Sequence, residues 1–272
     1  MKEYISFLEY QKKLKNVLSF HLLEKQNYEQ YLSKTYEYQE YMAVYQEVLK
    51  DFKSFIQNYN IHSSLELGIL YTCFLLPKGI FSITNQFQYK YLKGIFEPLE
   101  ILGAKVISGR GCCRHISKNL VDILNTCGYE AYYLKTEKID LSELHALVGI
   151  IYDNKKLTLD PTNKKIGYFI DQENIQTQGF LNTNKKYLYH CCYYNGISNL
   201  LNEQFMNDYN VDDFYHRNSL EEIKELFNIY SDISILYYQN ELDFLKFKKE
   251  QICNYQKIYK NMNQFFSYRK CD

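Results

Sequence analysis

The chain has 272 residues, of which 46% are hydrophobic, and its 32 Lys and Arg residues balance 32 Asp and Glu residues. This length predicts one or two domains with a sizeable core, and the hydrophobic content excludes intrinsic disorder. Because the net charge is zero and no basic stripe is present, the composition argues against nucleic-acid binding.

Neither the start of the chain nor its most apolar run has the character of a membrane segment. The first six residues lack the apolar core of a secretory signal. Residues 67–76 form the most apolar run, which ends at Pro77 and is too short to span a bilayer. We therefore expect a cytoplasmic protein without membrane contact, whose eight cysteines are reduced thiols. Their spacing includes no Cys-x-x-Cys pair, so no zinc ribbon and no cofactor are indicated.

Residues 1–64 are predicted to form a helical arm. Apolar residues recur there in steps of three and four, as on one face of an amphipathic helix. The stripe includes Tyr28, Tyr31, Tyr38, Tyr41, Tyr45, Val48, Phe52, Phe55 and Tyr59. We interpret this face as packing against the body of the same chain. The alternative is an arm that binds a partner or a second copy, although a tight coiled coil favours Leu and Ile over Tyr.

Residues 65–218 contain every glycine and proline of the chain and are predicted to form a mixed core. A helix is expected over residues 112–127, because Gly128 is a favourable C-terminal stop. Strand-like runs follow at residues 131–136, 145–152, 156–160, 167–170 and 187–194. One helix followed by an antiparallel meander is typical of an α+β fold.

Residues 219–272 are predicted to form two helices that cover the core. Ser219 and Glu222 have the spacing of a capping box at a helix start. The first helix carries an apolar stripe from Leu220 to Tyr230. The second carries Leu242, Leu245, Ile252, Tyr255, Ile258, Met262 and Phe265 at helical spacing.

A glycine-containing turn at residues 109–111 brings Cys112 and Cys113 to the start of the helix expected over residues 112–127. Free backbone N–H groups and the helix dipole stabilise negative charge at such a position. A cysteine there is expected to have a lowered pKa and to be a better nucleophile. Cys113 falls on the apolar stripe of this helix, and Cys112 lies one position off it. We therefore select Cys113 as the nucleophile.

His145 begins one strand-like run, and Asp160 ends the next. A two-residue turn at Asp153-Asn154 would pair Tyr152 with Lys155. This register places His145 and Asp160 on one face as diagonal neighbours, roughly 7–8 Å apart at the backbone. A three-residue loop would separate them. Since a carboxylate can accept from one imidazole nitrogen and leave the other facing a thiol, Asp160 is predicted to orient His145.

Three motifs of the sequence, in this order, resemble the transglutaminase-like superfamily of cysteine enzymes. They are residues 111–114 (Gly-Cys-Cys-Arg), 145–146 (His-Ala) and 159–162 (Leu-Asp-Pro-Thr). The resemblance spans about residues 65–170 and implies a papain-like core, in which a helix bearing the cysteine packs on an antiparallel sheet. It also implies a triad of Cys113 as nucleophile, His145 as general base and acid, and Asp160 as the residue that orients His145.

The chain departs from the family's pattern at two places. Leu147 and Val148 follow His-Ala, where many members have an aromatic residue. The side chain that would donate to the oxyanion is not evident. Gln86 and Gln88 are the candidates, beside the backbone N–H of Cys113.

The leading functional hypothesis is a thiol peptidase or amidase that acts on a peptide or protein through a thioester on Cys113. One alternative is acyl transfer to an amine, as by a transglutaminase or an arylamine N-acetyltransferase. The other is a catalytically inactive module whose helical flanks bind a protein partner or a second copy. A metal site is a weaker interpretation, because adjacent cysteines on a strand point to opposite sides. Its ligands would come from Cys112, Cys113, His115, His190, Cys191 and Cys192.

Overall fold

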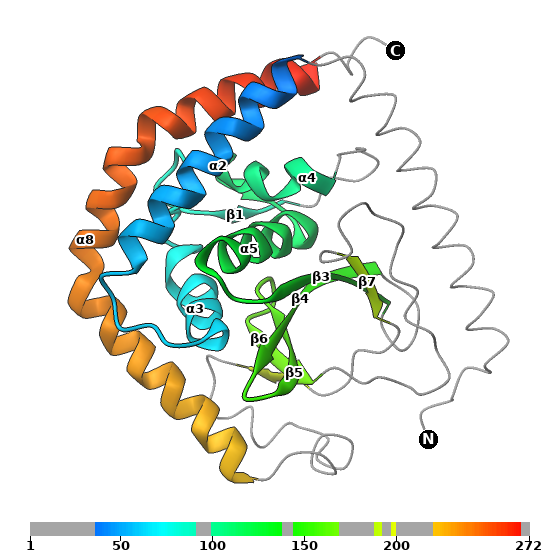
Figure 1. The fold of residues 1–272 in the computed structure, drawn as a ribbon, viewed down its shortest axis with the longest axis vertical. Coiled ribbons are helices and arrows are strands. Elements are labelled where there is room, and N and C mark those ends of the chain that lie inside the picture. Colours follow the sequence, from blue (N-terminus) through cyan, green and yellow to red (C-terminus); the bar gives the residue numbers. More distant parts are fainter. Residues whose placement is uncertain are drawn as a thin grey trace, which may run out of the picture.

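A six-stranded sheet and the helices stacked beside it make up most of what the computed structural model describes, namely residues 36–90, 99–137, 144–168, 188–191, 197–199 and 220–267 (Figure 1). The helices are α2 (Tyr36–Ile56), α3 (Ser64–Leu70), η1 (Tyr71–Leu75), α4 (Leu99–Leu102), η2 (Gly103–Ser108), α5 (Cys113–Cys127) and α8 (Leu220–Ser267). The strands are β1 (Gln88–Tyr89), β2 (Arg110–Gly111), β3 (Ala131–Glu137), β4 (Leu144–Tyr152), β5 (Lys155–Asp160), β6 (Lys165–Tyr168), β7 (Leu188–Cys191) and β8 (Ile197–Asn199). The predicted mixture of helix and sheet is confirmed.

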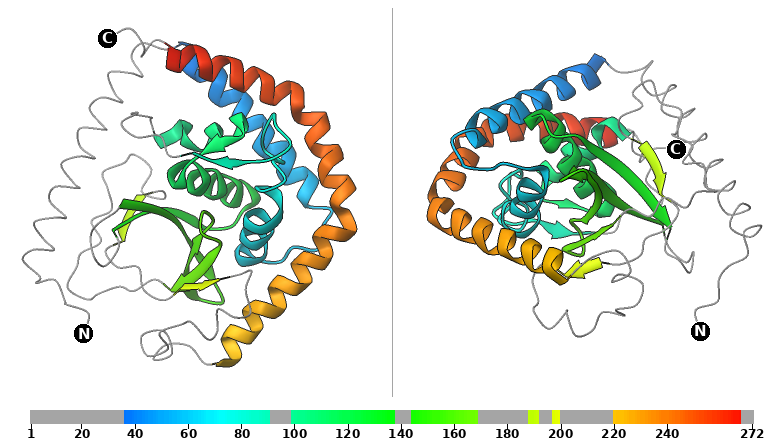
Figure 2. Two further views of the ribbon diagram at one scale, coloured as in Figure 1. Left: turned by 180° about the vertical axis from the view of Figure 1, so that it is seen from behind. Right: turned by 60° about the horizontal axis from the view of Figure 1, so that its bottom comes forward.

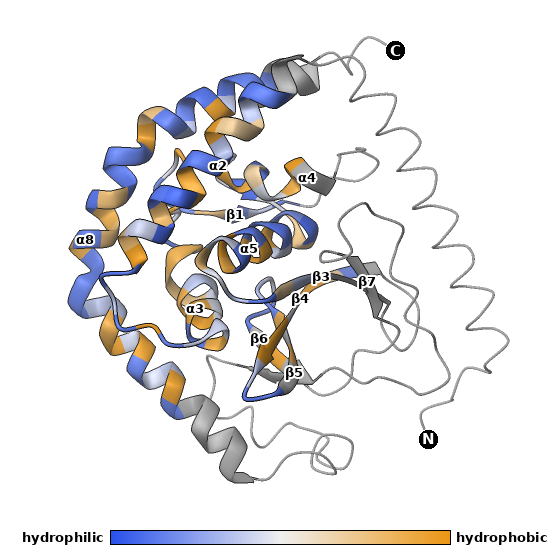
Figure 3. Ribbon diagram, in the orientation of Figure 1, coloured by the Kyte–Doolittle hydropathy of each residue, from blue (hydrophilic) through white to orange (hydrophobic). Residues whose placement is uncertain are grey.

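The helices form successive layers on the sheet. α5 contacts β3 and β4, and α2 lies between α5 and α8. α8 is the outermost helix and curves around α2 and α3, as the views of Figure 2 show. The inner sides of these helices are the apolar ones (Figure 3). Within the described ranges, no helix combines the length and the apolar character needed to cross a bilayer.

The six-stranded sheet has the order β7-β3-β4-β5-β6-β8. Strands β3 to β6 form the antiparallel meander that the sequence predicts. β7 departs from that prediction, because it pairs in parallel with β3 instead of extending the meander. The antiparallel ladder between β4 and β5 includes the predicted pair of Tyr152 with Lys155. Asp153 and Asn154 form the two-residue turn with φ values of 48° and 59°, a left-handed conformation that Asn and Asp tolerate.

α2 confirms the helical periodicity of the N-terminal arm for residues 36–56; residues 1–35 lie outside the described part of the chain. Its buried face consists of Tyr41, Tyr45, Val48, Leu49, Phe52 and Ile56. This face packs against other elements of the same chain, including α5 and α8. The packing agrees with the preferred interpretation of the arm over these residues.

α8 consists of two helical segments that meet at a kink, in agreement with the two helices that the sequence predicts. Asn240 has non-helical angles (φ −118°, ψ 15°), and its side-chain amide donates to the Leu236 carbonyl at 2.8 Å. A side chain that bonds into the backbone ladder is a recognised cause of a helix bend. The predicted cap at Ser219 lies outside the described residues.

The predicted inward position of Leu242 and Leu245 is wrong. Leu242 is 82% exposed and Leu245 is 39% exposed, whereas Phe244 and Phe247 are buried. The bend at Asn240 changes the register, and the larger aromatic rings take the inner positions. They join the rings of α2: Phe55 and Phe247 stack with centroids 4.7 Å apart, and so do Tyr59 and Phe244 at 4.9 Å.

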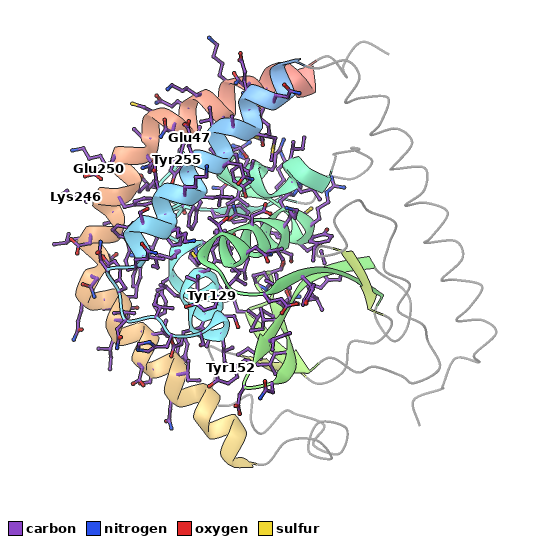
Figure 4. The ribbon with its side chains drawn as sticks, in the orientation of Figure 1. Glu47, Tyr129, Tyr152, Lys246, Glu250 and Tyr255 are labelled. Carbon is purple, nitrogen blue, oxygen red and sulfur yellow. The ribbon has the colours of Figure 1, made fainter. Side chains whose placement is uncertain are left out.

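Some polar side chains of α8 face solvent, and others form hydrogen bonds to an interior loop. Lys246 and Glu250 lie on its exposed outer side (Figure 4). The Tyr255 hydroxyl points inward and donates to the Ile80 carbonyl at 3.0 Å. Lys248, only 6% exposed, donates to the Thr84 carbonyl. α8 therefore holds the segment of residues 80–84, which leads into β1.

Candidate active site

A tight turn leads into the helix that carries the cysteines. Gly109 has φ 74°, and an added Cβ would meet the Thr84 side chain, so both conformation and space favour glycine there. β2 follows and pairs in parallel with β1, where the Gln88 N–H donates to the Gly109 carbonyl at 2.9 Å. The next residues are the N-cap Cys112 and the first helical residue, Cys113. The predicted helix over residues 112–127 is thus confirmed, with Cys112 as its cap.

His115 fixes the start of α5. The backbone N–H of Cys112 donates to His115 Nδ1 at 2.9 Å, and the imidazole is fully buried. A Cβ at Gly111 would lie 3.2 Å from the same Nδ1, so a larger residue there would press on the histidine. Sequence reasoning considered His115 only as a metal ligand. Its position three residues after the cap, where a capping box has Glu or Gln, is the signal that identifies its role.

Cys113 lies against the strand that carries His145. It is partly buried, and its sulfur accepts the backbone N–H groups of Ala146 and Arg114. Ser117, one turn further along α5, donates its hydroxyl to the Ala146 carbonyl at 2.9 Å. Both backbone groups of Ala146 therefore bond to α5. These contacts place the predicted nucleophile next to the residue that follows the predicted base.

His145 and Asp160 form the pair that the hairpin register predicts. His145 Nε2 lies 2.9 Å from Asp160 Oδ2, and the Asp160 side chain is 1% exposed. Because Nε2 is taken by this contact, Nδ1 is the nitrogen through which His145 would exchange a proton with a reacting group. A buried carboxylate bonded to an imidazole holds the ring in one orientation and stabilises its protonated form.

Asp160 is kept ionised by its neighbours. Burial favours the protonated acid, but the hydrogen bond and the charge of His145 outweigh it and hold the pKa of Asp160 below its usual value. Asn163 adds to this effect, because its backbone N–H donates to Oδ1 at 3.0 Å and its side-chain amide donates to Oδ2 at 2.8 Å. Sequence reasoning missed Asn163. An Asp at a strand end, followed by residues whose N–H groups it can accept, is the local signal.

The two thiols at the start of α5 act as one titrating unit. Cys112 and Cys113 are hydrogen-bonded to each other through their side chains, which lowers the pKa of Cys112 and raises the pKa of Cys113. The pair therefore loses one proton readily and holds the other. Cys112 is 3% exposed, so Cys113 is the more accessible of the two sulfurs.

The predicted oxyanion candidates lie beside the turn but at its outer side. Gln86 and Gln88 are both exposed, and Gln88 is paired with Arg110 in the short β1–β2 ladder. Their segment runs next to residues 109–111, close to the start of α5. The first backbone N–H groups of α5, that of Cys113 included, supply the positive end of the helix there.

The described residues contain no group of three or more His, Cys, Asp or Glu side chains that could hold a metal ion. Of the six residues considered as metal ligands, Cys112 and His115 are in contact, with Sγ and Nδ1 3.4 Å apart. His190 and Cys191 belong to β7, which lies next to β3, and Cys192 is outside the described residues. Comparisons of the chain with models of protein families, with curated proteins and with solved structures each found no match.

Proposed function

We propose that this protein is a cysteine-nucleophile enzyme that cleaves an amide or acyl bond through a thioester, as a thiol peptidase or amidase. The observation that carries the proposal is the hydrogen bond of His145 Nε2 to the buried Asp160, on the strand where the Cys113 sulfur meets Ala146 N–H. Taken singly, each residue has a structural role. A cysteine at the start of α5, beside the strand that carries a His–Asp pair, supports nucleophilic catalysis by a thiol.

The reaction proceeds in two halves. The Cys113 thiolate attacks the carbonyl carbon, and the charge on the carbonyl oxygen is stabilised by the backbone N–H of Cys113, with Gln88 as the candidate side-chain donor. The imidazolium of His145 gives its Nδ1 proton to the leaving amine, and a thioester remains on Cys113. Water then attacks the thioester, His145 takes its proton, and the acid leaves as the thiolate is restored. Asp160 holds the imidazole in place throughout.

The proposal extends to the family. The order of the cysteine helix, the His-Ala strand and the Asp-Pro-Thr strand end along the chain matches the resemblance to the transglutaminase-like superfamily. Contact of α5 with β3 and β4 is compatible with the papain-like core that this resemblance implies. A peptide or protein is the proposed substrate class.

Acylation by a generic ester tests the proposal without knowledge of the substrate. The protein is treated with p-nitrophenyl acetate, and the tryptic peptide of residues 111–114 is analysed by tandem mass spectrometry. We expect an acetyl group on Cys113 in the wild type. The acetylated peptide should be absent from Cys113→Ala and present in Cys112→Ala. Acetylation of the exposed Cys253 at the same rate, or full esterase activity in Cys113→Ala, would contradict the mechanism. An added amine that accepts the acetyl group in place of water would point to acyl transfer.

A second function is favoured by one feature of α8. Large apolar side chains are exposed on both segments of α8: Ile235 and Tyr238 form a stripe before the bend at Asn240, and Leu242 and Leu245 form one after it. A stripe of this kind can pack against another helix. A non-catalytic interaction module is therefore the second candidate. It predicts a Cys113 thiol no more reactive than Cys253 and an association in solution that Leu242→Lys abolishes.

A further inference from the structure

Cys112 and Cys113 present their sulfurs to each other. In a strand, adjacent side chains point to opposite faces, and the sequence interpretation assumed this for the pair. Here Cys112 is extended (φ −119°, ψ −173°) and Cys113 is already helical, so the change of conformation turns the two side chains together. The resulting hydrogen bond between the thiols contributes to both their titrations. At this helix start, the assumption that adjacent cysteine side chains point to opposite sides is therefore wrong.

The two thiols differ in surroundings. Cys113 is partly exposed, so its sulfur is the one of the two that an oxidant in solution can reach. Cys112 lies beneath it, 3% exposed, and its sulfur is 3.4 Å from Nδ1 of the buried His115. An accessible thiol beside an interior thiol is the arrangement of an oxidation-prone cysteine with a resolving partner.

We propose that Cys112 is a resolving thiol, which converts an oxidised Cys113 into a reversible Cys112–Cys113 disulfide and so protects the nucleophile from permanent oxidation. The inference rests on the proposed function only in treating Cys113 as the reactive thiol. It assigns to Cys112 a role that the acyl-transfer chemistry does not use.

The chemistry needs a peroxide as the oxidant. The Cys113 thiolate attacks one peroxide oxygen, the O–O bond breaks, and Cys113 sulfenic acid forms as hydroxide or alkoxide leaves. The Cys112 sulfur then attacks the sulfenic sulfur and gives up its thiol proton. The S–S bond forms, the S–O bond breaks, and the departing hydroxide takes up the proton as water. A thiol reductant later restores both cysteines by exchange.

Such a disulfide is short-lived in a reducing environment. Neighbouring Cα atoms are about 3.8 Å apart, below the lower limit of about 4.4 Å for an unstrained disulfide. Strain makes the bond more reducible. The expected state is therefore a temporary inactive form that reverts when the peroxide is removed.

Peroxide treatment followed by mass spectrometry tests the inference. Trypsin cleaves after Arg110 and Arg114, so the peptide of residues 111–114 carries these two cysteines and no others. In the wild type we expect hydrogen peroxide to produce this peptide lighter by two hydrogens and closed to alkylation, with full return after dithiothreitol. In Cys112→Ser the same treatment should leave sulfinic and sulfonic acid on Cys113, which dithiothreitol does not reverse. Serine is a favourable N-cap, so this variant retains the start of α5.

Two results would overturn the inference. One is accumulation of sulfinic and sulfonic acid on Cys113 at equal rates in wild type and Cys112→Ser. The other is a disulfide between Cys113 and a cysteine elsewhere, while Cys112 remains open to alkylation. Because the peptide mass is read without any substrate, either outcome is distinct from a failure of the acylation test. Absence of acylation, in turn, leaves the disulfide result standing.

Discussion

At the scale of single residues, Asp160 is the group on which the site depends most. It is buried, it bonds to His145, and it accepts two further hydrogen bonds from Asn163. Because the strand ends at Pro161, this carboxylate lies at the margin of the sheet, where it can receive donors from the following turn. One side chain thus holds His145 and closes the turn.

Replacement of Asp160 by Asn is expected to lower the free energy of unfolding at pH 7 by about 2 kcal/mol, the usual size for a hydrogen bond to a charged group. The pKa of Asp160 is lowered in the folded state, so its contribution is complete above its unfolded pKa of about 3.9 and is lost as the pH falls through the folded value. Urea unfolding of both proteins at pH 7 and pH 3 measures this. A difference that stays the same at both pH values would contradict the assignment.

Sequence reasoning identified the contact that strand pairing fixes, and it missed contacts that depend on capping or on local backbone angles. The pair of His145 and Asp160 was predictable, because a two-residue turn fixes which residues of a hairpin share a face. The role of His115 could have been predicted from its position three residues after the N-cap. The side-chain contact of Cys112 with Cys113 depends on the backbone angles where the chain enters α5, which periodicity alone does not specify.

At the scale of elements, the aromatic interface between α2 and α8 carries much of the packing. Phe52, Phe55 and Tyr59 from α2 and its following turn meet Phe244 and Phe247 from α8. The bend at Asn240 decides which residues of α8 face inward. The sequence predicted helical structure here, but a stripe cannot be followed through a bend that a side chain creates.

Phe244→Ala and Leu242→Ala form a pair of truncations two residues apart in α8. Phe244 is fully buried, so its truncation is expected to cost about 3–5 kcal/mol of stability. Leu242 is 82% exposed, and its truncation is expected to change stability by less than about 0.5 kcal/mol. Chemical denaturation followed by circular dichroism gives both values. Equal losses, or a larger loss for Leu242→Ala, would show that the inner face of α8 is assigned wrongly.

At the scale of the whole molecule, α8 is linked to the site through a chain of contacts. Lys248 bonds to the Thr84 carbonyl, and the Thr84 side chain fills the space beside Gly109. Gly109 in turn accepts the N–H of Gln88 and begins the turn that leads to Cys112. Contacts between segments more than 160 residues apart, such as that of Lys248 with Thr84, leave no pattern in a single sequence.

Lys248→Met tests whether α8 supports the turn of residues 109–111 that precedes α5. The Thr84 carbonyl also accepts the Ser82 hydroxyl at 2.9 Å, so it keeps a partner, and methionine fills similar space. We expect alkylation of Cys113 to become about tenfold slower, because small displacements of a reacting group have large effects on rate. The exposed Lys246→Met is the control and should leave the rate unchanged. Equal rates in the wild type and both variants would remove the proposed link.

The central claim, that Cys113 works with His145 and Asp160, is tested most directly by the pH dependence of its alkylation. Iodoacetamide labelling of Cys113, separated from Cys112 by tandem mass spectrometry, is followed in wild type, His145→Ala and Asp160→Ala. We predict fast labelling below about pH 7 in the wild type, a strong decrease in His145→Ala and a smaller one in Asp160→Ala. A pH dependence of alkylation with the midpoint of an ordinary thiol, about pH 8.5, that neither substitution changes would contradict the claim.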